Sequence, residues 1–166
     1  MTILGSIMNS PKDWFTGTGD KLSFQEILEH IHNHTSLSGM VSVGSDSFIR
    51  KQECIFSTAI CLYGANDQMG GRYFVRRITF KKKRFKTLLQ RIMKEVQDSV
   101  EIGILLSEHD PVIDIDIHLD VSASDREQAT SRFSDMLIGY AKGAGFDCKI
   151  KPDAFAAASI ADKHSK

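Results

Sequence analysis

Residues 112–121 read Val-Ile-Asp-Ile-Asp-Ile-His-Leu-Asp-Val, and this stretch decides the fold. Apolar and polar residues alternate without a break, which is the pattern of a β-strand whose two faces meet different surroundings. The polar side chains share one face: Asp114, Asp116, His118 and Asp120. A half-exposed strand would explain this pattern without any function.

The segments on either side of this strand are helical. An apolar stripe predicts a helix over residues 84–107, and a capping box at Ser124 and Glu127 begins a second helix. A strand between two crossover helices is expected to be parallel to its neighbours and covered on both faces. Polar side chains are unexpected there, so we expect at least one of them to line a cleft. Asp120 is best placed, because ligands gather at the C-terminal ends of such strands.

The rest of the chain adds strands and a last helix. Runs of β-forming residues at 40–43, 54–63 and 72–80 are separated by glycine-containing turns, which predicts an antiparallel meander. A short strand is expected at 146–150, and an alanine-rich helix after Pro152. The predicted fold is therefore α/β (α+β), with a mixed five-stranded sheet of three antiparallel and then two parallel strands, flanked by helices.

The first residues lack such patterns. Residues 1–22 are rich in turn-forming residues, and we expect an irregular leader there. A capping box at Ser23 and Glu26 begins a helix. We therefore predict a single domain over residues 23–166.

Composition excludes several classes of protein. The chain has 166 residues, with 21 Lys and Arg balancing 21 Asp and Glu, so only the distribution of charge can argue for nucleic acid. Three cysteines without CxxC spacing argue against a disulfide framework and favour the cytoplasm. No apolar run is long enough to span a membrane, and the first residues do not resemble a signal peptide.

Four carboxylates lie on different predicted elements. They are Asp46 at the end of the first strand, Glu95 on the border of the long helix's apolar stripe, Asp120 at the end of the fourth strand, and Asp162 near the end of the last helix. Taken singly, Asp46 also fits an Asx turn, and Glu95 a boundary residue that reaches solvent. Asp162 lies where a carboxylate opposes the helix dipole, which suggests that another interaction holds it.

Together the four carboxylates predict a metal site. Converging carboxylates repel one another and raise each other's pKa unless a cation lies between them. Oxygen ligands without cysteine favour Mg²⁺ or Mn²⁺ over zinc. Two such ions roughly 4 Å apart can bind the attacking and leaving oxygens of a phosphodiester displacement.

The order of these elements and carboxylates resembles the ribonuclease-H-like superfamily. Five strings resemble the YkuK type of uncharacterised bacterial proteins: GSDS at 44–47, GGRYF at 70–74, RIMKE at 91–95, IHLD at 117–120 and KPDAFAAASIADKHSK at 151–166. The resemblance covers about residues 24–166. A helix before the first strand and the lack of an apparent hybrid-binding insertion are departures from ribonuclease H itself.

The resemblance implies a three-layer fold and a divalent-metal site for hydrolysis of nucleic-acid phosphodiesters. Its ligands would be Asp46, Glu95, Asp120 and Asp162. Ser47, His118 and Lys151 are the expected supporting residues, with His118 as a possible proton shuttle or a partner of the metal ligands.

A basic stretch gives independent support for a nucleic-acid partner. Seven basic residues lie between positions 76 and 86, with Phe80 and Phe85 among them: Arg76, Arg77, Lys81, Lys82, Lys83, Arg84 and Lys86. Such a patch would attract a phosphate backbone. A solvated turn with ordinary surface charge is an equally simple interpretation.

Two hypotheses about function follow. The first is a nuclease dependent on Mg²⁺ or Mn²⁺ that acts on RNA, DNA or a hybrid. The second is a non-catalytic module of the same fold that binds nucleic acid or a protein.

Overall fold

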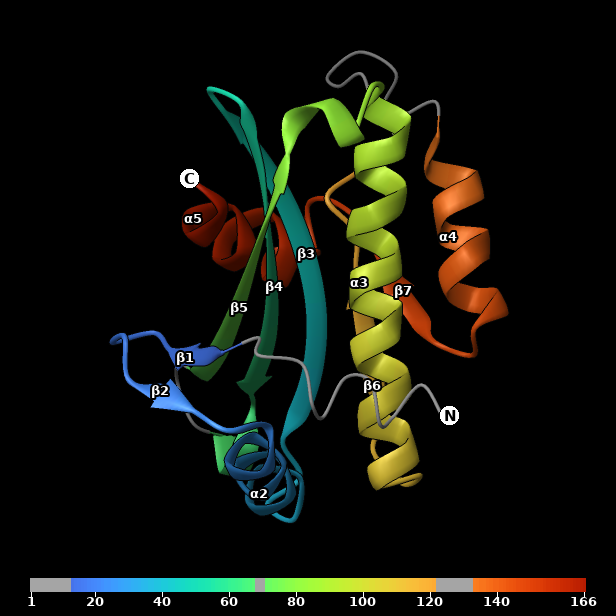
Figure 1. Ribbon diagram of the computed structural model, residues 1–166. Helices are drawn as coiled ribbons and strands as arrows, with labels where there is room; N and C mark the ends of the chain where they lie inside the picture. The colour runs from blue at the N-terminus through green and yellow to red at the C-terminus, as the bar shows by residue number, and fades with distance from the viewer. Residues whose placement is uncertain (1–12, 68–70, 122–132) are drawn as a thin grey trace.

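The computed structural model describes residues 13–67, 71–121 and 133–166 of the chain (Figure 1). Within these ranges, seven strands form one mixed sheet. They are β1 (Trp14–Thr16), β2 (Lys21–Leu22), β3 (Met40–Arg50), β4 (Glu53–Tyr63), β5 (Gly71–Lys81), β6 (Ile115–His118) and β7 (Asp147–Lys149). The order across the sheet is β2-β1-β5-β4-β3-β6-β7. β6 and β7 run parallel to β3, and the other neighbours are antiparallel.

Helices cover both faces of this sheet. They are α2 (Phe24–Thr35), α3 (Leu88–His109), α4 (Ser134–Gly143), the π-helical segment η4 (Ala156–Ala161) and α5 (Asp162–Ser165), with short 3₁₀ turns η1 (Ala65–Asp67) and η2 (Lys82–Arg84). Figure 1 shows α3 and α4 beside each other on one face and the C-terminal helix on the other. The α/β class and the three-layer arrangement are therefore confirmed.

The predicted number of strands, five, is too low. β1 and β2 lie inside the segment for which an irregular leader was expected, and β1 pairs with β5 from Trp14↔Arg76 to Thr16↔Phe74. The buried Trp14 side chain anchors this addition to the sheet. Strands of three and two residues are too short to show alternation, so the sequence pattern did not reveal them.

The first predicted strand also continues further than expected. β3 pairs with β4 without interruption from Met40↔Tyr63 to Arg50↔Glu53, and Lys51 takes the positive φ of 54° in the turn. Asp46 therefore lies within β3 rather than in a turn at its end. Asp120, by contrast, lies two residues beyond β6, which is shorter than predicted. The predicted capping box at Ser124 lies outside the described residues.

Two apolar cores hold the layers together. The larger one joins the sheet to α2, α3 and α4, and it includes Ile27, Val43, Phe74, Ile102 and Leu137. The smaller one lies under the C-terminal helix and consists mainly of small side chains: Ala59, Cys61, Val75, Ala156 and Ala161. Small residues let the C-terminal helix lie close to the sheet, but they bury little apolar surface.

Within the described residues, none of the helices combines the length and the apolar composition that a membrane-spanning segment needs.

Gly103 on α3 fixes how closely this helix approaches β6. A Cβ atom at this position would lie 3.0 Å from Phe146 and 3.2 Å from Ile117, whereas nothing lies within 4 Å of one at Gly139 on α4. We expect Gly103→Val to lower the free energy of unfolding by about 1–3 kcal/mol through overpacking, measured by urea denaturation. Gly139→Val is the matched control and should be nearly neutral. Equal effects of the two substitutions would contradict this account of the packing.

Candidate functional site

The site begins where β6 ends beside the central strand. β6 pairs with β3 only from Val41↔Ile115 to Gly44↔His118, and β3 then continues to Arg50. The chain leaves β3 towards β4 on one side, and it leaves β6 towards β7 on the other. In open α/β sheets, ligands bind where adjacent strands have connections that diverge in this way. We call the region beside β3, beyond the end of β6, the crevice after that rule.

Two of the predicted carboxylates lie at this crevice. Asp46 follows Gly44 by two residues, and Asp120 follows His118 by two residues, so both lie two positions beyond the last pair of the ladder. The Ser165 hydroxyl donates a hydrogen bond of 2.9 Å to Asp46 Oδ2, which shows that Asp46 faces the C-terminal helix.

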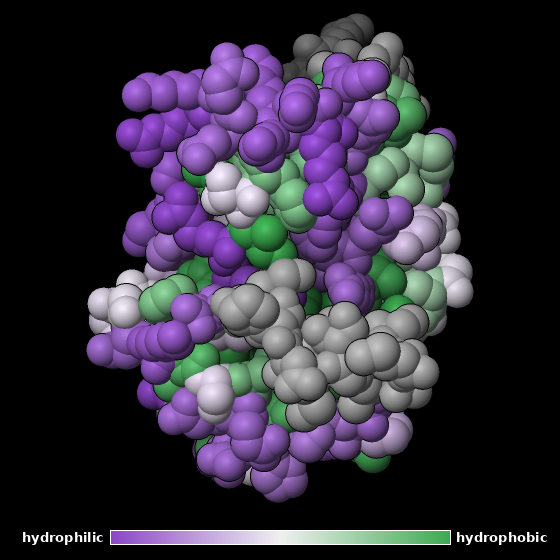
Figure 2. Space-filling model, in the orientation of Figure 1, coloured by the Kyte–Doolittle hydropathy of each residue, from purple (hydrophilic) through white to green (hydrophobic). Residues whose placement is uncertain are grey.

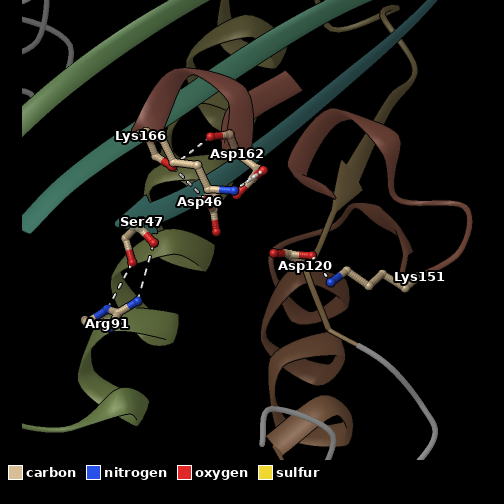
Figure 3. A network of polar contacts seen from close by, with 8 residues as sticks. Asp46, Ser47, Arg91, Asp120, Lys151, Asp162 and Lys166 are labelled. Atoms are coloured by element: carbon tan, nitrogen blue, oxygen red, sulfur yellow. Dashed lines mark hydrogen bonds and ion pairs between the residues drawn. The ribbon is translucent and has the colours of Figure 1, made fainter. Parts of the chain in front are cut away.

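Lysines accompany the carboxylates on this face. Lys166 Nζ lies 2.8 Å from Asp162 Oδ2, and Lys151 Nζ lies 2.7 Å from Asp120 Oδ1. Figure 3 shows Asp46, Asp162 and Lys166 grouped together, with Asp120 and Lys151 across from them. The charges of Asp162, Asp46 and Asp120 all raise the pKa of Lys166, with the direct contact to Asp162 having the largest effect. The Lys166 ammonium group therefore contacts Asp162 and is also stabilised by the charges of Asp46 and Asp120.

Glu95 approaches the same crevice from the opposite face of the sheet. Ser47 follows Asp46 on β3 and points to α3, because side chains alternate along a strand. Its hydroxyl donates a hydrogen bond of 2.5 Å to Glu95 Oε1, and Arg91 Nε donates to that hydroxyl at 3.1 Å. The free edge of β3 thus lies between Asp46 on one face and Glu95 on the other.

Burial and mutual repulsion change the protonation of this pair. Burial raises the pKa of Asp46 to about 6. The hydrogen bond from Ser165 lowers this pKa, whereas the negative charges of Asp120 and Asp162 raise it further. Burial, followed by the charge of Asp46, raises the pKa of Glu95 to about 8. Near neutral pH, Glu95 is therefore largely protonated.

The residues fit a hard divalent cation by their chemistry. Carboxylate oxygens are the ligands that Mg²⁺ and Mn²⁺ prefer, and the repulsion at Asp46 is what such a cation relieves. Among the described residues, however, no three His, Cys, Asp or Glu side chains have an arrangement that would hold a metal ion. A cation would have to displace the lysines that contact Asp120 and Asp162.

His118 contacts the C-terminal helix. Its side chain is fully buried, and Nδ1 accepts a hydrogen bond of 3.1 Å from the Ala156 N–H at the start of η4. Burial lowers the pKa of His118 to about 4, so the ring is neutral at physiological pH. The hydrogen bond to Ala156 links the buried ring of β6 to the first turn of η4.

Arg76 is the one predicted phosphate-binding residue that the structure removes from the surface. Only 2% of it is exposed, and its guanidinium carbon lies 5.4 Å from the centre of the Trp14 ring. The other residues of the basic stretch are exposed: Arg77, Lys81, Lys82, Lys83, Arg84 and Lys86. Figure 2 shows a largely hydrophilic surface at the end of the molecule where the β3–β4 hairpin and the start of α3 lie.

Sequence reasoning missed Arg91, Ser165 and Lys166. Arg91 precedes Glu95 by four residues on α3, and this helical spacing is a signal that could have found it. Lys166 has the same spacing from Asp162. Ser165 has no comparable signal, because its contact with Asp46 depends on how the C-terminal helix docks.

The fold and the site together define an α/β protein with carboxylates beside its central strand β3, at the point where β6 ends. A family model described as Ribonuclease H-like matches residues 23–166, and the chain belongs to this family. The family points to a function related to nucleic acids. The comparison with curated proteins gave no match, and neither did the comparison with solved structures.

The raised pKa of Glu95 predicts how stability changes with pH. The folded state keeps the Glu95 proton up to about pH 8, whereas the unfolded chain releases it near the ordinary glutamate pKa of 4.5. The free energy of unfolding therefore falls as the pH rises between these two values. At pH 8 in chelator, we expect Glu95→Gln to raise the free energy of unfolding by roughly 1–3 kcal/mol and to flatten the pH dependence. Glu108→Gln, at an exposed position on the same helix, is the control. The same change of stability between pH 5.5 and pH 8 in the wild type and in Glu95→Gln would contradict the prediction.

Proposed function

We propose that the protein is a nuclease that depends on a divalent metal ion and hydrolyses nucleic-acid phosphodiester bonds at the crevice beside β3. One observation carries the proposal: the Lys166 ammonium group lies among the charges of Asp162, Asp46 and Asp120. The positive charge of Lys166 offsets the repulsion among these carboxylates, and a divalent cation would supply the same charge. Membership in the ribonuclease H-like family supports the same function.

The residues of the chain take separate roles in this proposal. Asp46 and Asp120 would hold Mg²⁺ or Mn²⁺, and Glu95 and Asp162 would complete the set of ligands. Such ions supply a water of lowered pKa and stabilise charge at the phosphorus. On the α3 face of the sheet, Arg91 donates a hydrogen bond to the Ser47 hydroxyl, and this hydroxyl orients Glu95.

The lysines set a condition on this activity. Lys166 is exposed and lies at the end of a helix, so it can move away from Asp162 without unfolding the core. Its departure would leave the carboxylates free for a cation. A phosphate group of the substrate is a natural new partner for the released ammonium group.

A second candidate is the non-catalytic module that binds nucleic acid. The ion pairs Lys151–Asp120 and Lys166–Asp162 favour it, because they neutralise two carboxylates without any metal. The exposed basic residues would then bind the phosphate backbone, and chelator would not weaken that binding.

Removal of the central carboxylate separates the two candidates. We expect Asp46→Asn to reduce Mn²⁺-dependent cleavage of labelled DNA and RNA strands by at least about 100-fold, because a ligand is lost while the fold is kept. The melting temperature should stay within a few degrees of the wild type. Asp114→Asn, at an exposed position before β6, is the control and should cleave normally. Full activity of Asp46→Asn, or no cleavage by the wild type with any strand, would exclude the nuclease.

The lysine among the carboxylates predicts a gain of affinity. We expect Lys166→Gln to bind Mn²⁺ about 3- to 10-fold more tightly than the wild type, because the metal no longer competes with the ammonium group. Isothermal titration calorimetry at pH 7.5 measures this change. Lys163→Gln removes an exposed lysine from the same helix and is the matched control. Unchanged or weaker Mn²⁺ binding by Lys166→Gln would show that Lys166 does not occupy the site of a cation.

A further inference from the structure

One face of the sheet continues beyond the C-terminal helix. The last turn of α5 places the Ser165 hydroxyl on Asp46, and β3 continues from there to Arg50. Because the pairing with β4 is unbroken, side chains alternate regularly, and Phe48 and Arg50 share the face of Asp46. These two residues are exposed.

The register of the neighbouring strands adds further cations to this face. Asp46 pairs with Ser57, which pairs with Arg77 on β5, so that Arg77 lies level with the carboxylate. Arg50 pairs with Glu53, which pairs with Lys81. Phe48 lies on β3 between Asp46 and Arg50. The row across the sheet from Asp46 ends in the exposed Arg77, and the row from Arg50 ends in the exposed Lys81. We call this surface the Phe48 platform, and it consists of Phe48, Arg50, Arg77 and Lys81.

The exposed ring of Phe48 needs an explanation. It is 37% exposed although its partner Ile55 on β4 is only 5% exposed, so the ring covers the sheet on one side and meets solvent on the other. Three basic side chains border the ring, and the exposed Glu53 carboxylate lies between two of them, Arg50 and Lys81. Such a charged surface is unsuited to an apolar partner, which would have to desolvate the charges. It suits a ligand that has both flat aromatic groups and negative charge.

We propose that the Phe48 platform binds a single strand of nucleic acid, with the Phe48 ring stacked on an unpaired base next to the phosphodiester at the carboxylates. This inference rests on the proposed function of the acidic crevice and names its substrate class. The basic side chains of Arg50, Arg77 and Lys81 contact the phosphates on either side. Stacking on aromatic rings combined with a basic groove is how proteins hold single strands without sequence preference.

The spacing and the geometry of the platform favour a single strand over a duplex. Two residues along a strand span about 7 Å, so Phe48 lies within one or two nucleotides of a phosphate at Asp46. In a duplex the faces of the bases are covered by their neighbours, and a ring cannot stack on them without unpairing. A strand with exposed bases has no such cost.

The test measures binding separately from cleavage. Fluorescence anisotropy in EDTA at low salt compares labelled 12-nucleotide strands of thymidylate and of uridylate with a 12-base-pair duplex. We expect the wild type to prefer the single strands and Phe48→Ala to lose about 5- to 100-fold in affinity for them, with little change for the duplex. Phe48→Trp should keep the affinity. Phe15→Ala is the matched control, because Phe15 is also 37% exposed but lies on β1, which β5 and β4 separate from β3 in the sheet.

Comparison of the thymidylate and the uridylate oligonucleotides shows whether the platform distinguishes DNA from RNA. Asp46→Asn is a further variant, and it should still bind the single strands. Unchanged single-strand binding by Phe48→Ala, or equal binding of duplex by the wild type, would overturn the inference. If Asp46→Asn abolishes cleavage while Phe48→Ala binds normally, the nuclease stands and the platform falls. If Phe48→Ala loses binding in a protein that cleaves nothing, the platform stands and the nuclease falls.

Discussion

The repulsion among carboxylates at the end of β6 is the constraint on which the rest of the site depends. Asp46 is almost buried and feels the charges of Asp120 and Asp162, while Glu95 is buried on the other face of the sheet. The protein meets this repulsion with the Lys166 and Lys151 ammonium groups and with a proton on Glu95. The exposed Lys166 side chain can move away, and Glu95 can release its proton, so both groups can give way to another cation. A divalent cation beside Asp46 would relieve the same repulsion.

The position of the C-terminal helix makes this arrangement possible. Its core contacts are mostly alanines, which contribute little burial, and specific polar contacts add to them. His118 accepts a hydrogen bond from the start of η4, and the Ser165 hydroxyl at the other end of the helix contacts Asp46. The same helix carries Asp162 and Lys166. The C-terminal helix therefore contacts the buried His118 ring of β6 at its start and the Asp46 carboxylate at its end.

Much of the fold was predictable because long periodic patterns record burial. The alternation before Asp120 and the apolar stripe of α3 identified a strand and a helix, and their order predicted a mixed sheet with helices on its faces. The short strands β1 and β2 gave no such signal, since pairing with β5 and the burial of Trp14 stabilise them. The end of β3 was misplaced for a related reason: a glycine and serines favour turns locally, but pairing with β4 overrides that preference.

The candidate site was predictable in part. The carboxylates could be selected because each was unusual for its element, and their charges do influence one another in the folded chain. Their partners were harder to find, because contacts such as Ser165 with Asp46 join residues far apart in sequence. Arg76 shows the opposite error: a basic residue in a basic stretch lies buried beside Trp14, because alternation on β5 points it inward.

Anomalous diffraction from crystals grown with Mn²⁺ tests the central claim most directly. The account predicts manganese bound between Asp46 and Asp120, with the Lys166 side chain moved away from Asp162. An intact Lys166–Asp162 ion pair with no manganese beside Asp46, at a concentration that saturates other acidic sites, would contradict it.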